Sequence, residues 1–375
     1  MARKLRVQPV GVCYHVVTRI AHREFMFYET ERDIVVGLVR RTAEFSGVTV
    51  IAYCVMSNHL HLFLFIEKPE SLLMFERWAD IVGVDLEHAR AGASYRLPDG
   101  TILGEDEADE VRSCAAMSLF ERYGLTFAGL KRRIQAIMRP VAYQELMDKW
   151  SSMPKADLDL ECARFLRRMY DLSGFMKTLK QDISQYYNVR HGHTGALWEG
   201  RFRDSYVERS LDPMTSVSTY IDLNPWRAGM CAHPEEYKWC SFGAAVGGSE
   251  FARSGYRFMY GNADDWSTLE LIHREQIQHR MDNDLEGQEE IEDALFTSGG
   301  IIGSSSFVED VTRRERVAFP RERKSSPQEV CVGGLKLFAL RHLKAFRKCA
   351  FTMGSDPIAH RPHCTPSLWL TYSFS

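Results

Sequence analysis

Residues 48–67 read VTVIAYCVMSNHLHLFLFIE, and the fold expected for the chain follows from this stretch. Residues 48–56 and 59–67 are two runs of β-branched, aromatic and other apolar residues, which is typical of strands. Only Ser57 and Asn58 separate the two runs, and this spacing suits a tight hairpin. The stretch therefore predicts two neighbouring antiparallel strands.

The residues before this hairpin add one more strand and one helix. Residues 13–20, CYHVVTRI, mix β-branched and aromatic residues as a strand does. Residues 31–45 have apolar side chains at the spacing of an amphipathic helix, and Gly47 follows as its expected C-cap. The order strand, helix, strand, strand predicts an α+β fold with helices on a mainly antiparallel sheet.

The rest of the chain suggests three segments. Residues 1–245 form the expected main domain, interrupted by a helical and loop-rich insertion at about 70–155. Residues 246–310 are expected to be an acidic linker and helical extension, because 282–293 carry seven acids and no base, the pattern of a solvated linker. Residues 311–375 form a basic C-terminal region.

Composition limits the class of protein. The chain has 375 residues, 45% hydrophobic and 26% charged, which is ordinary for a soluble globular protein. A net charge of -3 argues against blanket binding to polyanions, so a nucleic-acid surface would need an uneven charge distribution. Nine scattered cysteines favour reduced thiols in the cytoplasm, and no apolar run reaches the ~18 residues of a membrane span.

Two histidines begin the second strand of the hairpin. On a strand, His59 and His61 project from the same face, so they can offer neighbouring nitrogen ligands to one divalent metal. The plainer alternative is a pair of partly buried histidines bonded to backbone. The pair alone does not separate the two interpretations.

A second pair lies in residues 210–230, SLDPMTSVSTYIDLNPWRAGM, which predict a helix that stops at Asn224-Pro225. Tyr220 and Asn224 lie one turn apart on one face of that helix. A tyrosine hydroxyl can act as a nucleophile where a metal stabilises charge on the electrophile, and an amide oxygen is a ligand that Mg²⁺ or Mn²⁺ accepts. The plainer alternative is a packed tyrosine and a helix stop.

Four segments together resemble a known family. YHVVTRI, AYCVMSNHLHLFLF, GALWEGRFRDSYV and YIDLNPWRAGM occur in the order found in the HUH single-tyrosine transposases (insertion-sequence-200-like), and most closely resemble the REP-associated branch. The resemblance covers most of 10–66 and 170–242. It implies a ferredoxin-like fold, in which an antiparallel sheet carries helices on one face. Ser57 stands where the family usually has proline.

The resemblance also implies a function and its residues. Tyr220 corresponds to the family's nucleophile, and His59, His61 and Asn224 to its ligands for Mg²⁺ or Mn²⁺. The implied activity is cleavage and rejoining of single-stranded DNA near hairpins through a 5′-phosphotyrosine intermediate. The alternative is a catalytically silent hairpin-DNA-binding protein of the same fold.

The expected DNA contacts follow from phosphate neutralisation and base stacking. Basic and aromatic side chains interleave before the tyrosine helix, and the candidates are Lys177, Lys180, Arg190, Trp198, Arg201 and Arg203. Each basic residue can alternatively be an ordinary solvated charge. Single-stranded or hairpin DNA is the expected partner, a homodimer is a further candidate, and no membrane partner is expected.

Overall fold

The structure is a computed structural model, which describes residues 11–82, 95, 101–263, 265–283, 288–297, 300–318, 328–332 and 335–340. Its centre is an antiparallel sheet with the strand order β2-β3-β1-β4. These elements follow the chain order β1 (Val12–Arg19), α1 (Glu29–Ser46), β2 (Val48–Val55), β3 (His59–Ile66), α8 (Leu172–His191), β4 (Arg203–Glu208). This is the ferredoxin-like order, so the expected α+β class is confirmed.

The predicted hairpin is the β2–β3 pair. Val55 lies opposite Leu60 and Val48 opposite Ile66, with a bulge between Val50 and Ala52. Because strand side chains alternate between faces, the odd-numbered residues of β3 share one face, which we call the histidine face.

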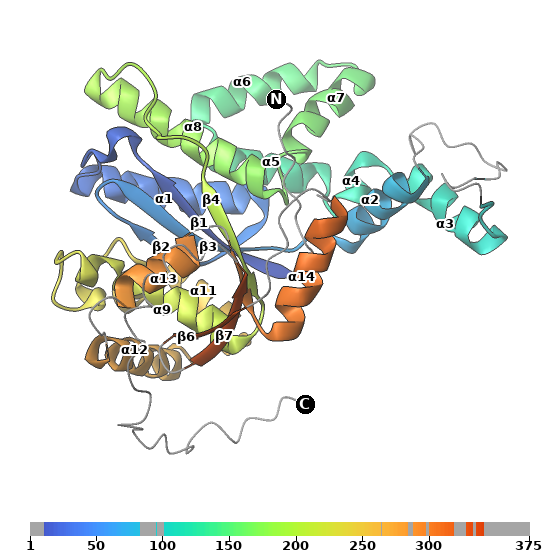
Figure 1. Ribbon diagram of the computed structural model, residues 1–375. Coiled ribbons are helices and arrows are strands. Elements are labelled where there is room, and N and C mark those ends of the chain that lie inside the picture. The colour runs from blue at the N-terminus through green and yellow to red at the C-terminus, as the bar shows by residue number, and fades with distance from the viewer. Residues whose placement is uncertain are drawn as a thin grey trace.

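Two helices pack together over the other face. Tyr14 points away from the histidine face, and its ring contacts Tyr206. Helices α1 and α8 contact each other and lie on that side of the sheet (Figure 1). Helix α1 ends at Gly47, which has a φ of 66° and is the predicted C-cap.

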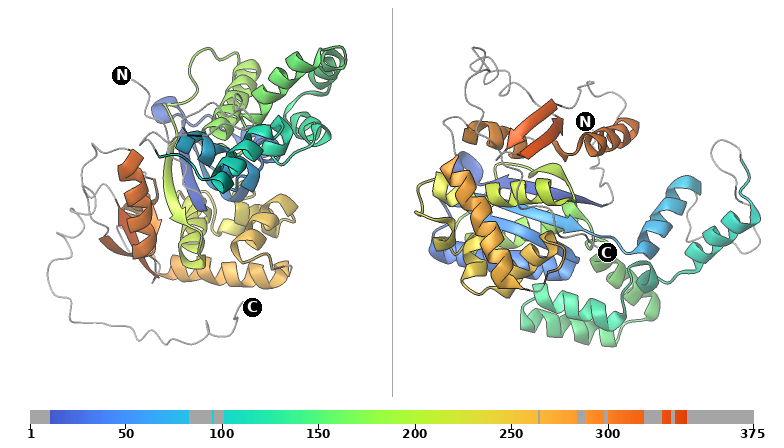
Figure 2. Two further views of the ribbon diagram at one scale, coloured as in Figure 1. Left: turned by 90° about the vertical axis from the view of Figure 1, so that its right-hand side faces the viewer. Right: turned by 90° about the horizontal axis from the view of Figure 1, so that it is seen from below.

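The region expected as an insertion lies between β3 and α8 and is largely helical. Its helices are α2 (Glu70–Val82), α3 (Glu105–Ala116), α4 (Leu119–Arg122), α5 (Phe127–Ile137), α6 (Pro140–Ser151) and α7 (Lys155–Leu166). Helix α5 packs against α1. Helices α2 and α3 extend away from the sheet, where Trp78, Val111 and Cys114 belong to a small core of their own (Figure 2).

Helices also cover the histidine face. The family resemblance implied helices on one face of the sheet only, and this expectation is therefore incomplete. The helices on the histidine face are α9 (Leu211–Arg227), α11 (Glu250–Met259) and α13 (Gln288–Thr297), with the short α10 (Ser241–Val246) between α9 and α11. Helix α12 (Trp266–Asp282) packs on α9 and α11. Helix α9 contacts β2, β3 and β4, and α13 contacts β1 and β4.

Helix α9 does not stop at Asn224, as the following proline predicted, but runs to Arg227. Pro225 has no N–H to donate to the carbonyl of Ile221, which would be its normal helical partner. The side-chain Nδ2 of Asn224 donates to that carbonyl at 3.3 Å instead. The helix can therefore continue for three further residues, most of one turn.

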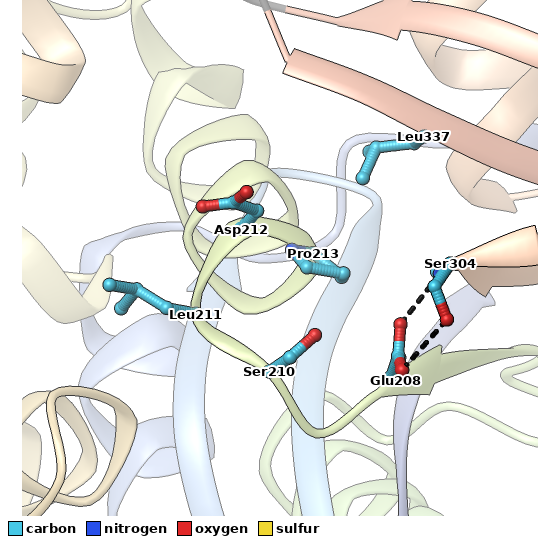
Figure 3. Close-up of a pocket in the computed structure, with 8 residues that line it drawn as sticks. Glu208, Ser210, Leu211, Asp212, Pro213, Ser304 and Leu337 are labelled. Atoms are coloured by element: carbon cyan, nitrogen blue, oxygen red, sulfur yellow. Dashed lines mark hydrogen bonds between the residues drawn. The ribbon is translucent and has the colours of Figure 1, made fainter. Parts of the chain in front are cut away.

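The C-terminal part of the described chain extends the sheet beyond β4. Strand β5 (Ile301–Gly303) pairs with β4 in parallel, β7 (Leu335–Leu340) pairs with β5, and β6 (Gln328–Val332) pairs with β7 at the edge. Helix α14 (Ser305–Ala318) follows β5 in the chain. The described residues thus form a seven-stranded sheet that is mixed and not wholly antiparallel. Glu208 ties β4 to this extension by accepting hydrogen bonds from the backbone N and Oγ of Ser304 (Figure 3).

Core residues on both sides of residue 245 form one cluster. Ile51, Tyr256 and Phe296 are among its fully buried members, and the cluster extends to Leu337. Parts of the expected basic region, 319–327 and 341–375, lie outside the described residues. Among the described helices, none is long and apolar enough to cross a membrane.

Candidate active site

The histidine strand and the tyrosine helix meet on the histidine face. The ring centroids of His59 and His61 are 4.9 Å apart, and those of His61 and Tyr220 are 5.8 Å apart. The structure therefore brings together three side chains from β3 and α9 that the sequence predicted as one site.

His61 belongs to a directional chain of hydrogen bonds. Its Nδ1 lies 3.1 Å from Nε2 of His15 on β1, and Nδ1 of His15 lies 2.8 Å from the carbonyl oxygen of Phe296 on α13. A carbonyl only accepts, so His15 carries its proton on Nδ1 and accepts at Nε2. His61 then donates from Nδ1. Its Nε2 keeps a lone pair, is buried, and has no hydrogen-bond partner among the described residues.

His59 is held in the same way by a neighbour in the turn. Its Nδ1 lies 2.7 Å from Oδ1 of Asn58, and an amide oxygen only accepts, so Nδ1 carries the proton and Nε2 keeps its lone pair. Burial lowers the pKa of His59 and of His15 to about 4. Burial, followed by the nearby His59, lowers the pKa of His61 well below its usual range. The three imidazoles are therefore neutral at neutral pH, the form in which histidine binds metals.

These nitrogens fit the divalent metal that the family resemblance implies. A buried imidazole nitrogen without a partner is costly unless something binds there, and metal-bound histidines usually donate their other nitrogen to a protein acceptor. Asn224 donates from Nδ2 to the carbonyls of Tyr220 and Ile221, so its amide oxygen is the atom that would bind a metal. Within the described part of the chain, no three His, Cys, Asp or Glu side chains are grouped to hold a metal. Asn224 and groups from outside the protein would complete the set.

Tyr220 is buried and hydrogen-bonded. Its side chain packs against Phe296 at 4.8 Å between ring centroids, and its hydroxyl donates to Oδ1 of Asp293 at 3.0 Å. Burial, and then the charge of Asp293, raises the pKa of the Tyr220 hydroxyl well above its usual range. Only 2% of the residue is exposed, whereas the Asp293 side chain is 49% exposed. Asp293 therefore stands between the hydroxyl and solvent.

The acidic segment that brings Asp293 here was expected to be a solvated linker, and this expectation is wrong for α13. Glu292 is fully buried and pairs with Arg227 at 2.9 Å and with Arg280 at 2.6 Å. Acidic composition predicted solvent, but the buried arginines on α9 and α12 are counter-charges that composition cannot locate. Arg19 lies opposite His59 and 4.0 Å from Asp293, and it was likewise not predicted.

A cavity lies elsewhere on the molecule. It measures about 270 Å³ and lies between the start of α9 and β5, where Glu208, Asp212 and Pro213 line it (Figure 3). Its two carboxylates would repel a phosphate. We therefore place the candidate active site on the histidine face and not in this cavity.

Residues 10–76 match the model of a family described as "Transposase IS200 like". This part of the chain is therefore similar to IS200-like transposases. The matched segment runs from β1 into α2 and includes both histidines, whereas Tyr220 and Asn224 lie beyond it. Comparisons with curated proteins and with solved structures gave no match.

Among the predicted DNA contacts, Arg203 is placed beside the IS200-like segment by strand pairing, because β4 pairs with β1. Val17 lies opposite His61 on one side and opposite Arg203 on the other, so all three residues lie in one row across the histidine face. Arg201, Arg203 and Lys177 are exposed, and none has an ion-pair partner among the described residues.

The other predicted DNA contacts take part in internal interactions. Trp198 donates from Nε1 to the Lys180 carbonyl and to Ser184, and Nζ of Lys180 donates to the Gly200 carbonyl. Arg190 pairs with the buried Glu31 at 3.2 Å. These contacts give Trp198, Lys180 and Arg190 structural roles, and a role in DNA binding would be additional.

Proposed function

We propose that this protein is a DNA transposase of the REP-associated branch, which cleaves and rejoins single-stranded DNA near hairpins. The observation that carries the proposal is the unpartnered, buried Nε2 of His61 beside Tyr220. That nitrogen lies on a strand of the IS200-like segment, which supports a transposase role.

Tyr220 is the nucleophile in this proposal. Its hydroxyl oxygen bonds to the scissile phosphorus while the bond from phosphorus to the 3′ oxygen breaks. The tyrosine loses a proton, the 3′ oxygen gains one, and the products are a 5′-phosphotyrosine and a free 3′-hydroxyl. The link retains the phosphodiester's energy, so the reverse attack by a 3′-hydroxyl rejoins the DNA without a nucleotide cofactor.

His59, His61 and Asn224 would hold Mg²⁺ or Mn²⁺. When bound, such an ion neutralises charge on the phosphate and helps to orient it. Arg203, in the same row as His61, contributes positive charge along the path of the strand. The hydroxyl of Tyr220 becomes available to the phosphate when the Asp293 side chain rotates away from it.

One observation favours the alternative, a silent hairpin-DNA-binding protein. Tyr220 is buried, and its hydroxyl is bonded to a carboxylate that repels a phosphate. A protein that only binds DNA would tolerate this arrangement permanently. The two functions differ in whether the DNA becomes covalently attached.

The deciding experiment uses labelled single-stranded hairpin oligonucleotides taken from the DNA that flanks the gene. With Mn²⁺ or Mg²⁺, the full chain should form a covalent adduct that maps to Tyr220 by peptide mass spectrometry. Tyr220→Phe should abolish the adduct and keep DNA binding, whereas Tyr186→Phe on α8 should behave as the wild type. Binding without any adduct would support the silent protein, and DNA attached to Tyr186 or Tyr187 would overturn the assignment.

A further inference from the structure

We propose that His15 is a positioning residue, which fixes the orientation and tautomer of His61 so that Nε2 of His61 faces the metal. The carbonyl of Phe296 fixes His15 in turn, so α13 forms part of the metal site without binding the metal. This inference rests on the proposed function. It adds His15 as a residue that does not bind the metal but is hydrogen-bonded to His61, the proposed metal ligand.

The direction of the hydrogen bonds carries the argument. A free neutral histidine exchanges between two tautomers, and only the one with its proton on Nδ1 offers Nε2 to a metal. His15 cannot donate to His61, because its single proton is committed to the Phe296 carbonyl. His61 must therefore place its proton on Nδ1, and Nε2 is left with its lone pair.

Packing fixes the ring planes as well. The rings of His15 and His61 lie edge to edge and nearly parallel, with centroids 5.3 Å apart and planes 14° apart. The ring of Tyr220 meets both edge-on at 5.8 Å. His15 is fully buried, so it has no room to turn without moving one of these neighbours.

Another buried histidine shows how a purely structural histidine differs in this chain. His273 is also fully buried, and it bonds Tyr260 through Nδ1 and Asp222 through Nε2. Both of its nitrogens have protein partners, and neither is hydrogen-bonded to a residue that, like His61, has a buried nitrogen without a partner. His273 therefore provides a matched control for His15.

The test measures Mn²⁺ binding to the full chain without DNA, by titration calorimetry. His15→Phe keeps the ring volume and removes the acceptor, and we expect Mn²⁺ affinity to fall about 10- to 100-fold. His15→Gln supplies one donor and one acceptor, so it should restore affinity to within about threefold. His273→Gln should leave the affinity unchanged, even where it lowers the melting temperature.

The tautomer can also be read in the wild-type protein, which keeps the inference testable if His15→Phe fails to fold. Two-bond ¹H–¹⁵N NMR of ¹⁵N-histidine-labelled, metal-free protein reports which ring nitrogen carries the proton, and the His61 signals are assigned by their loss in His61→Gln. We expect the proton on Nδ1. A proton on Nε2, or a folded His15→Phe with wild-type Mn²⁺ affinity, would overturn the inference alone. A wild-type chain that binds no Mn²⁺ would overturn the proposed metal site and this inference with it.

Discussion

Asp293 and Tyr220 place a negative charge at the position that a phosphate has to approach. The carboxylate accepts a hydrogen bond from the Tyr220 hydroxyl at 3.0 Å, and after burial its charge is the next largest cause that raises the pKa of Tyr220. Arg19, 4.0 Å away, balances that charge only weakly at a half-exposed position. At the scale of single residues, the described arrangement would therefore hold back Tyr220, the proposed nucleophile.

Removing the charge of Asp293 should release that restraint. Asp293→Asn keeps a hydrogen-bond acceptor of the same size but takes away the repulsion of phosphate, and it lowers the pKa of Tyr220 towards its usual range. We expect covalent adduct with hairpin DNA to form several-fold faster near neutral pH, measured in a single-turnover gel assay. A slower reaction would instead make Asp293 a required proton acceptor.

The buried histidines make the fold sensitive to acid. In the folded chain burial lowers the pKa of His15 from 6.5 to about 4, which corresponds to about 3 kcal/mol. The unfolded chain takes up this proton first, so the contribution of His15 to stability should fall as pH drops from 6.5 to 4 and stay level below that. Urea unfolding across this range should show the loss, and His15→Gln should lose about 3 kcal/mol less. Parallel curves for the two proteins would contradict the prediction.

At the scale of elements, α13 is held by buried charge. Glu292 pairs with Arg227 on α9 and with Arg280 on α12, and the side chains are 6% exposed or less. Such a network is costly to break, because removing one partner leaves the others buried without a counter-charge. The position of α13 decides where the Phe296 carbonyl and Asp293 lie.

Glu292→Ala should therefore destabilise the fold by about 3–5 kcal/mol. The buried guanidinium groups of Arg227 and Arg280 would lose their carboxylate partner, and α13 would lose its ion pairs to α9 and α12. Chemical denaturation with the exposed Glu275→Ala on α12 as control should show the difference, since a surface change costs about 0.5 kcal/mol or less. Equal midpoints for the two variants would show that the triad does not hold the helix.

The sheet places Arg203 in one row with His61, and its proposed effect on DNA binding should be electrostatic. Arg203→Ala should weaken binding of single-stranded DNA and reduce the slope of log affinity against log salt by about 0.7, the value for one phosphate contact. Arg132, exposed on α5 behind α1, is the matched control and should leave the slope unchanged. An equal change in both variants would make the effect one of net charge.

Local periodicity was sufficient to predict the elements that carry the proposed chemistry. The hairpin and the shared face of His59 and His61 follow from a period of two, and they are present. The contacts of Asp293 and Phe296 join residues 73 and 281 positions apart in the chain, and no local pattern specifies such distances. His15 did leave a signal, because it is a polar residue on the same face as Cys13 and Val17 in a buried strand.

At the scale of the whole molecule, the expected boundary at residue 245 crosses a buried polar network. Asp222 on α9 is fully buried and accepts hydrogen bonds from the Tyr256 hydroxyl at 2.6 Å and from His273 at 3.1 Å. Gly255 lies so close to β2 that an added Cβ would come within 2.3 Å of the Ile51 carbonyl oxygen. The α9 helix and the sheet therefore depend on residues that lie beyond the family-like segments.

A fragment of residues 1–245 should consequently fail to fold, although the sequence suggested it as the catalytic domain. It would leave the Asp222 carboxylate in the core without Tyr256 and His273, at about 1–3 kcal/mol for each lost partner, and more for a charge. It would also remove α13, the Phe296 carbonyl that holds His15, and the buried partner of Arg227. The marginal stability of a domain cannot absorb these losses together. Thermal unfolding by circular dichroism should show a cooperative transition for the full chain and none for the fragment, whereas a cooperative fragment that binds Mn²⁺ like the full chain would show that the site is complete without its C-terminal helices.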